Sequence, residues 1–199
     1  MKLEGYKLIF VVVGLIGVLL IATPALFRVI RLPGGEQFSE LYLLGPDHNA
    51  QNYPFDIAVG QNYSVYVDVG NHLGSSAFYV LYIKLGNGTD QMPNATLGTP
   101  SSLHPLYEYR FSIQDGMTWE SLVNFSFSSA SVSGNNSQIN TLQINDVAFN
   151  VDKSSIMDSD KTAFTYRLLF ELWIYDSSFN AISFNDRFVD LQLSLTRTI

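Results

Sequence analysis

The sequence contains no cysteine and few positive charges, and both shortages narrow the classes of protein to which it can belong. Without cysteine there is neither a disulfide framework nor a thiolate nucleophile, and this absence fits an oxidising compartment as well as a reducing one. Residues 32–199 carry seventeen Asp and Glu against seven Lys and Arg. So acidic a region repels nucleic acid and anionic lipid, and no nucleic-acid partner is expected.

Charged residues are also missing from one long apolar run. Leu8 to Phe27 are twenty residues without Asp, Glu, Lys or Arg. The hydrocarbon core of a bilayer, about 30 Å thick, is crossed by a helix of about 20 apolar residues. We therefore predict a short N-terminal tail at residues 1–7 and a transmembrane anchor at residues 8–30, through which the chain contacts the membrane.

A cleaved secretory signal is the alternative reading of this segment. Lys2 and Lys7 precede the apolar run, as in a signal peptide, and Thr23-Pro24-Ala25 resembles a cleavage region. Signal cores, however, are usually about 7 to 15 residues long. The greater length here, followed by Arg28 and Arg31, favours a retained anchor, although the near tie in flanking positive charge leaves its orientation undecided.

N-glycosylation sequons indicate the side on which the rest of the chain lies. Five N-x-[ST] sites occur, where composition alone would give about two. We predict a single-pass cell-membrane protein whose C-terminal domain stands outside the cytoplasm. The expected glycosylation sites are Asn62, Asn87, Asn94, Asn124 and Asn135.

Beyond a breaker-rich hinge at residues 31–35, the pattern of residues 36–199 is typical of an all-β domain. No window shows apolar residues at the helical period, whereas runs with two-residue alternation recur between turn signals. Nine short strands in about 160 residues suggest a β-sandwich. The expected strands are 37–44, 54–59, 63–70, 77–85, 105–113, 122–129, 139–150, 163–175 and 187–196.

Three stretches carry more detailed expectations. Val65, Val67 and Val69 alternate with Ser64, Tyr66 and Asp68, so one face of that strand should be buried and the other wet. A terminal hairpin is expected to return the chain at Asn180 and the Phe184-Asn185-Asp186-Arg187 turn, and Trp173 is expected in the core. The segments 86–104 and 128–138 are expected to be surface loops.

The stretch from Gly70 to Ser76 joins two such alternating runs and contains a histidine. Gly70 and Gly74 bracket it, and Asn tolerates positive φ. We interpret Gly70, Asn71, His72 and Gly74 as a structural turn rather than a chemical site. His48, His72 and His104 show no spacing that places two imidazoles on one metal.

Acidic residues in VDKSSIMDSDK give a weak calcium candidate. Asp152, Asp158 and Asp160 could supply several oxygen ligands. The segment lacks the glycine and the terminal glutamate of an EF-hand, and Lys153 and Lys161 stand beside the acids. A solvated loop is the favoured reading, so no metal and no cofactor are predicted.

Tyrosine is abundant in the first half of the domain. A half-exposed tyrosine offers apolar area with a polar tip, which suits contact with a protein or a glycan, although tyrosines more often fill core positions. A Tyr-rich face of the sandwich is therefore the expected surface for a protein or glycan partner. The residues are Tyr53, Tyr63, Tyr66, Tyr79, Tyr82, Tyr107 and Tyr109.

Several of these pieces occur in an order that resembles a known family. They are Glu36 to Pro46 (EQFSELYLLGP), Asn52-Tyr53-Pro54, Ile57 to Asn62, Val67 to His72 and Trp119-Glu120. Over residues 36–196 the chain resembles the carboxy-terminal region of the archaeal membrane family called domain of unknown function 1616. The resemblance implies an archaeal source and an extracytoplasmic β-domain of immunoglobulin-like character. It brings no catalytic or ligand residues, and the several transmembrane helices typical of that family are here reduced to one.

The sequence therefore predicts a membrane-anchored surface module for interaction or structure, and not an enzyme. There is no G-x-S-x-G elbow and no cysteine nucleophile. One alternative is an accessory subunit of a larger membrane complex, with Gly14 and Gly17 allowing close helix contact. The other is an enzyme acting on surface polysaccharide, since a fold does not exclude a grafted site.

Overall fold

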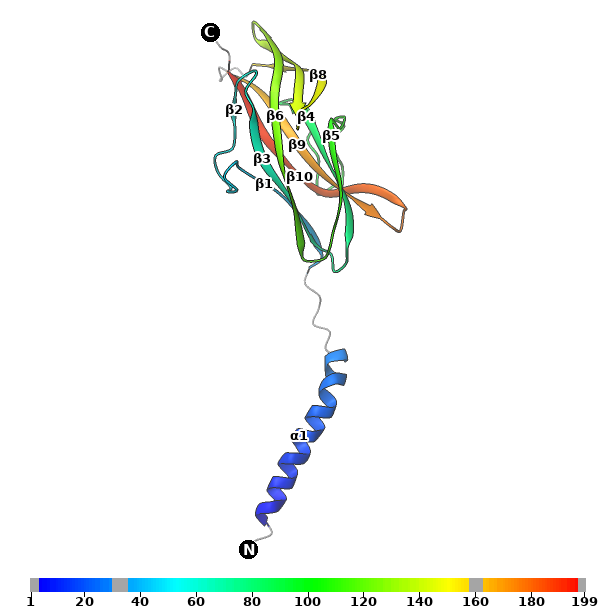
Figure 1. Ribbon diagram of the computed structural model, residues 1–199. Helices are drawn as coiled ribbons and strands as arrows, with labels where there is room; N and C mark the ends of the chain where they lie inside the picture. Colours follow the sequence, from blue (N-terminus) through cyan, green and yellow to red (C-terminus); the bar gives the residue numbers. More distant parts are fainter. Residues whose placement is uncertain (1–3, 30–35, 158–162, 197–199) are drawn as a thin grey trace. The chain divides into compact units, whose positions relative to one another are not determined.

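The computed structural model describes residues 4–29, 36–157 and 163–196, and the chain forms two compact units, Met1–Glu36 and Gln37–Ile199. The first contains helix α1, Glu4–Val29, and the second contains all the strands (Figure 1). The helix begins four residues before the expected anchor. The expected hinge at residues 31–35 lies outside the described residues.

The stretch of helix α1 from Ile9 to Val13 is apolar on every side. Ile9, Phe10, Val11, Val12 and Val13 are consecutive in the sequence, and all five are exposed. Successive residues of a helix point about 100° apart, so five in a row sample the whole circumference. Within the described residues, no helix combines the length and the apolarity of a membrane span.

The strands form two five-stranded sheets, and the first has the order β1-β3-β6-β7-β8. All its pairings are antiparallel. The strands are β1 (Phe38–Leu44), β3 (Tyr63–His72), β6 (Met117–Ser133), β7 (Asn136–Ile144) and β8 (Val147–Ile156).

The second sheet has the order β2-β10-β9-β4-β5. Its strands are antiparallel except for β2, which runs parallel to the end of β10. The strands are β2 (Asp56–Ile57), β4 (Ala77–Asn87), β5 (Tyr107–Ile113), β9 (Ala163–Asp176) and β10 (Ala181–Thr196).

One hydrophobic core contains residues of both sheets. Val65, Val67 and Val69 of β3 are fully buried, as the alternation predicts. From the second sheet, alternate residues of β4 and β9, such as Leu81 and Phe170, join the same cluster. The all-β expectation is confirmed. Trp173 is only partly buried, so its expected place in the core is wrong: it lies on the opposite face of β9, edge-on to Tyr82 with ring centroids 5.6 Å apart.

The expected strand 139–150 is in fact a hairpin. The chain turns at Asn145-Asp146, whose φ values are 46° and 65°, between β7 and β8. Positive φ at both central residues defines a type I′ turn, which glycine usually signals and which Asn and Asp also tolerate. The expected loop 128–138 is wrong as well, because β6 and β7 pair through it up to Ser133 and Asn136.

The turn expected at residues 184–187 is also wrong. The β9–β10 hairpin turns between Asp176 and Ala181, a segment that contains the expected Asn180 with φ 49°. Residues 184–187 lie within β10, where the register shifts between Phe184 and Arg187 and Asp186 has φ 56°. A bulge uses the same residue types as a turn, so the local sequence did not separate the two.

Strand β3 continues further than the alternation indicates. It pairs with β1 through His72, opposite Phe38, so the connection to β4 is confined to residues 73–76. Gly74 has φ +79° and supplies the positive φ of this turn, whereas Gly70 and Asn71 are strand residues. An added Cβ at Gly70 would lie 2.8 Å from Glu40 Oε2, so this glycine permits a close side-chain approach.

Candidate functional site

The outward face of the first sheet gathers acidic and aromatic side chains across three strands. Asp68 of β3 lies opposite Tyr42 of β1 on one side and Glu120 of β6 on the other. Tyr66 and His72, two places along β3 in one direction and four in the other, share this face because side chains alternate along a strand. With His48 from the loop after β1, these residues form what we call the acidic–aromatic face: Glu40, Tyr42, His48, Tyr66, Asp68, His72 and Glu120.

Asp68 is the buried centre of the acidic–aromatic face. The alternation of β3 predicts a wet side chain, but Asp68 is only 4% exposed. Its Oδ2 atom is buried and accepts no hydrogen bond from the described residues. Desolvation, with a further contribution from the charge of Glu120, raises the pKa of Asp68 to about 6.

His48 is held over this centre by a tight loop. Gly45 donates to the Asn49 carbonyl at 2.7 Å, and a Cβ at Gly45 would collide with the Gln51 carbonyl at 1.9 Å, so glycine is required. The His48 ring contacts Tyr66 with a centroid distance of 3.6 Å. Its Nε2 lies 3.4 Å from Glu120 Oε1. The loop thus covers the Asp68 side of the sheet with an imidazole.

His72 occupies the other end of the acidic–aromatic face in a similar way. Its ring stacks on Phe38 with centroids 4.8 Å apart. Its Nε2 lies 3.6 Å from Glu40 Oε2. The structure therefore brings His48 and His72 onto the same face of one sheet, each beside a carboxylate, whereas His104 is an exposed loop residue elsewhere.

The chemistry of the acidic–aromatic face suits a cationic group. An ammonium or guanidinium group is attracted by carboxylates and by the faces of aromatic rings. Because Asp68 Oδ2 is buried, such a group would donate to this oxygen only after the side chains that cover it moved aside. A metal ion fits less well, because the described residues include no cluster of three or more His, Asp or Glu side chains with suitable geometry.

Asn71, next to the histidine, faces inward and is fully buried. Its amide nitrogen donates to the Ser75 and Ile113 carbonyls at 2.8 and 2.9 Å. Its oxygen accepts from the Leu73 amide at 3.1 Å and from the Tyr79 hydroxyl at 3.3 Å. These bonds connect the β3–β4 turn to the end of β5 and leave none of its hydrogen-bonding capacity for a ligand.

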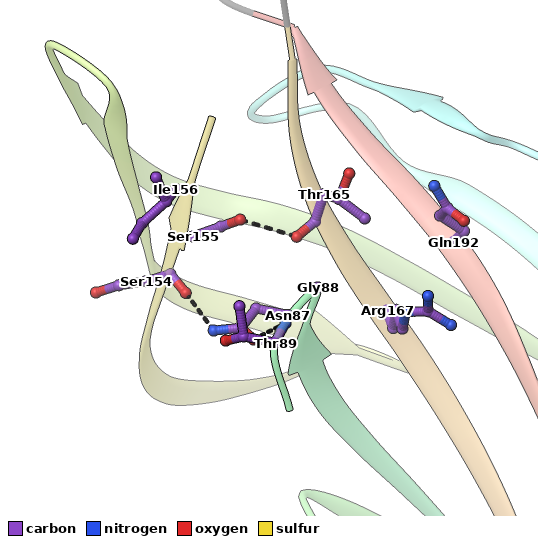
Figure 2. A pocket seen from close by; sticks show the side chains of 9 residues that line it. All are labelled: Asn87, Gly88, Thr89, Ser154, Ser155, Ile156, Thr165, Arg167 and Gln192. Carbon is purple, nitrogen blue, oxygen red and sulfur yellow. Dashed lines mark hydrogen bonds between the residues drawn. The ribbon is translucent and has the colours of Figure 1, made fainter. Parts of the chain in front are cut away.

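A separate polar pocket of about 400 Å³ opens between β4, β8, β9 and β10 (Figure 2). Arg167 lines it and is tied to Asp190, with 2.9 Å between Nη1 and Oδ2. The other described lining residues carry amides, hydroxyls or apolar groups and include no carboxylate or imidazole: Asn87, Gly88, Thr89, Ser154, Ser155, Ile156, Thr165 and Gln192. Such a lining can bind polar groups but offers no acid–base pair for proton transfer.

The five sequon asparagines differ in their surroundings. Asn62, Asn94, Asn124 and Asn135 are exposed. Asn87 is partly buried in the pocket wall, where its amide nitrogen donates to the Ser154 carbonyl at 2.8 Å (Figure 2). Its oxygen accepts from the backbone amides of Thr89 and Asp90.

The weak calcium candidate is not a loop where the structure describes it. Asp152 lies in β8, with φ 43°, and its Oδ1 is 3.4 Å from Gln138 Nε2. Asp158 and Asp160 lie outside the described residues.

The seven tyrosines do not form a common face, so that expectation is wrong. Tyr79 is in the core, and Tyr66 and Tyr82 lie on the outward faces of different sheets. The remaining four pack against the core from its margins: Tyr53, Tyr63, Tyr107 and Tyr109. The face that gathers polar and aromatic groups is centred on Asp68, for which the alternation along β3 predicts exposure to solvent. In the sequence, the signal for this face was an acidic residue within a run of alternating valines.

Comparison with solved structures gives β-glucosidases from Listeria innocua. The complex with glucose has 9% identity and a TM-score of 0.40, covering 82% of this chain and 17% of that chain. A mutant in complex with laminaribiose has 9% identity and a TM-score of 0.42, covering 82% and 16%. This chain therefore spans about a sixth of the length of those enzymes. Comparison with curated proteins gives no match.

A family model covers most of the chain. The family described as Domain of unknown function (DUF1616) matches residues 32–174, from the segment before β1 into β9. The match includes Tyr42, Asp68 and Glu120 of the acidic–aromatic face. The chain belongs to the DUF1616 family.

Proposed function

We propose that this protein is a single-pass, membrane-anchored cell-surface module that binds a cationic group of a partner protein and catalyses no reaction. The observation that carries the proposal is the buried Asp68 carboxylate, which has an oxygen without a donor and stands between Tyr42 and Glu120. Buried carboxylates are usually paired, and a site that lacks its pair invites a positive ligand. In this proposal the domain lies outside the cytoplasm.

The anchor in this proposal is the segment 8–30. Its support is the uncharged run from Leu8 to Phe27 and the exposure of apolar side chains around α1. A helix that is apolar on all sides is stable in an apolar surrounding, and a stretch of about 20 residues matches a bilayer core. The exposed sequons Asn62, Asn94, Asn124 and Asn135 support an exported domain.

The fold proposed for the domain is an immunoglobulin-like sandwich. Strand pairing supports it: β3 pairs with β6 in one sheet, and β4, β9 and β10 are consecutive neighbours in the other. In immunoglobulin domains strands B and E, and strands C, F and G, are related in this way. The β7–β8 hairpin, which continues the first sheet beyond β6, is an addition to that plan.

Binding without turnover is supported by the polar pocket. The residues that line it in the described chain offer hydroxyls, amides and one guanidinium, but no nucleophile next to a base. An enzyme acting on polysaccharide would need two carboxyl groups about 5 to 10 Å apart across a cleft, and the described lining of this pocket contains no carboxyl group. The surface role is therefore preferred to the polysaccharide-acting enzyme.

Membrane attachment is tested with the full chain in isolated membranes. We expect it to stay with the membranes through alkaline carbonate extraction and the domain to be digested by protease added from outside intact cells. Release by carbonate, or protection of the domain, contradicts the proposed topology. A partner that co-purifies stoichiometrically in mild detergent supports the accessory-subunit alternative.

Recognition of a cationic group is tested by titrating the full chain in detergent with a tetra-arginine peptide, and with tetra-glutamate for comparison. We expect tetra-arginine alone to change the fluorescence or NMR signals of the acidic–aromatic face, and Glu120→Gln to weaken its binding at least about fivefold, since a charge-assisted hydrogen bond is worth about 1.5 to 3 kcal/mol. Asp56→Asn is the matched control, because Asp56 is an exposed acid on β2. Equal binding by both variants contradicts the assignment of this face.

A further inference from the structure

Among the strands that the structure describes, β5 is the last of the second sheet, and only β4 pairs with it. Its seven residues pair with β4 in an unbroken register from Tyr107 opposite Ile83 to Ile113 opposite Ala77. The order of the sheet places no described strand on the other side of β5. The backbone groups on that side can therefore pair with another strand.

The other edges of the two sheets are blocked by their own side chains or are very short. On β1, Arg187 donates to the Ser39 carbonyl at 3.1 Å and Tyr53 donates to the Leu43 carbonyl at 2.8 Å. On β8, Asn87 donates to the Ser154 carbonyl, and the register shifts along that strand. Strand β2 has only two residues.

Strand β5 has no such protection over most of its length. Within the described residues, a side chain bonds its backbone only at its last position, where Asn71 donates to the Ile113 carbonyl. Natural edge strands are usually blunted by bulges, charges or covering groups. The charged residues of β5 are Glu108 and Arg110, and their arrangement decides whether they hinder or favour pairing of this edge.

Glu108 and Arg110 project from the same exposed face of β5, on either side of Tyr109. In the single chain they pair with each other, at 2.7 Å between Nε and Oε1 and 3.3 Å between Nη2 and Oε2. A lone repulsive charge would discourage pairing of this edge with itself. Glu108 and Arg110 carry opposite charges and flank Tyr109, and this arrangement favours pairing of β5 with β5 of a second copy.

The favoured pairing is fixed by symmetry. In an antiparallel pair related by a two-fold axis through Tyr109, Glu108 of each copy lies opposite Arg110 of the other. The inward residues Tyr107 and Phe111 then also lie opposite each other, as an aromatic cross-strand pair. An axis one residue away, at Glu108 or Arg110, places like charges opposite each other, so only one of these three registers is electrostatically matched.

We infer that two copies of this chain dimerise by antiparallel pairing of β5 with β5 about a two-fold axis at Tyr109, which joins their second sheets into one continuous sheet. This interface is separate from the acidic–aromatic face, which belongs to the other sheet. It requires no movement of the strands, because β5 already has a regular ladder and its outward side chains are exposed.

The test measures the oligomeric state of the full chain in detergent by sedimentation equilibrium. Wild type is expected to be dimeric, and Glu108→Arg and Arg110→Glu are each expected to raise the dissociation constant at least about tenfold, because each places like charges across the axis. Mixing the two variants restores both opposite-charge pairs, so we expect a heterodimer. The double variant with the charges exchanged should again form a homodimer.

Asp56→Arg is the control for Glu108→Arg, because it makes the same charge change on β2, at the opposite edge of the same sheet, and should leave the dimer intact. Circular dichroism melting curves show whether each variant is folded. A monomeric wild type overturns the inference. So does a dimer that survives both single substitutions, or the failure of the two folded single variants to associate when they are mixed.

Discussion

Lys84 Nζ lies 2.6 Å from Glu171 Oε2, and both side chains are almost completely buried on the outward face of the second sheet. The pair is closed over by the loop between β4 and β5. Ser101 donates its backbone amide to Glu171 Oε1 at 3.0 Å and its hydroxyl to the same oxygen, and it accepts from Lys84 at 3.2 Å. Both charged groups of this buried ion pair also have hydrogen-bond partners. Removal of one charge by substitution is costly, because the other charge then stays buried without its partner.

Removal of one partner of this pair should therefore destabilise the domain strongly. For Glu171→Gln we expect a loss of about 3 to 5 kcal/mol in the free energy of unfolding. The matched change Asp190→Asn breaks the more exposed pair with Arg167 and should cost about 1 kcal/mol or less. Urea unfolding of both variants checks the difference. Equal losses would contradict the account of the buried pair.

Asn71 and His72 are adjacent but should respond differently to alanine. Asn71→Ala leaves the Ser75 and Ile113 carbonyls without their donor, so we expect a loss of about 2 to 4 kcal/mol. His72 is partly exposed and stacks on Phe38 at the surface, so His72→Ala should cost about 1 kcal/mol or less. Thermal unfolding measures both, and a larger effect at His72 would reverse this interpretation.

The stability of the domain should depend on pH through Asp68. Its pKa is raised from 3.8 to about 6 on folding, so the folded state binds the proton more tightly than the unfolded state. Its favourable contribution is complete below about pH 3.8 and is lost as the pH rises through about 6. The charged groups that act on Asp68 are Glu120 on β6 and His48 in the loop, whereas Glu40 on β1 acts on the neighbouring Tyr42.

Asp68→Asn should consequently stabilise the domain at pH 7.5 by roughly 1 to 2 kcal/mol and have little effect at pH 4. Denaturant unfolding at the two pH values measures this difference. Asp56→Asn, at an exposed acid, serves as the control and should show no such pH dependence. A variant that loses stability at pH 7.5 would show that the Asp68 carboxylate is favourable when charged.

Glycan occupancy should differ among the sequons if the protein is made in a host that glycosylates exported chains. Asn135 is exposed at a turn and should be modified. Asn87 is partly buried and uses its amide nitrogen to bond Ser154, so modification of the folded domain would disturb the pocket wall. Mass spectrometry of glycopeptides should find Asn135 occupied and Asn87 largely unoccupied. Full occupancy of Asn87 would mean that modification precedes folding.

The local pattern predicted the strands whose two faces differ most. Val65, Val67 and Val69 signalled β3, because alternation of large apolar groups has one favourable arrangement at a half-buried sheet. The positions of turns and bulges were predicted less well. The turn at Asn145-Asp146 contains no glycine, and the bulge at residues 184–187 has the composition of a turn.

The candidate site could not be predicted from the local sequence, and the reason is different. Asp68 has the spacing of a solvent-facing residue, and it is buried only because Tyr42, Glu120 and the loop carrying His48 come from three other parts of the chain. The Lys84–Glu171 pair joins residues 87 apart in the sequence. From the local sequence, Lys84 and Glu171 each resemble an ordinary surface charge. Their burial follows only from the pairing of β4 with β9 and from the loop that covers them.

The sequence by itself determined the apolar N-terminal segment, the all-β character of the rest, its acidic charge and most strand positions. These follow from composition and short periodicity, which depend on neighbours along the chain. Only the tertiary structure decided which charges are buried, which edge strand is open and which side chains share a face. Those properties depend on which strands pair and on what covers them, and strand pairing joins residues whose separation in sequence carries no local signal.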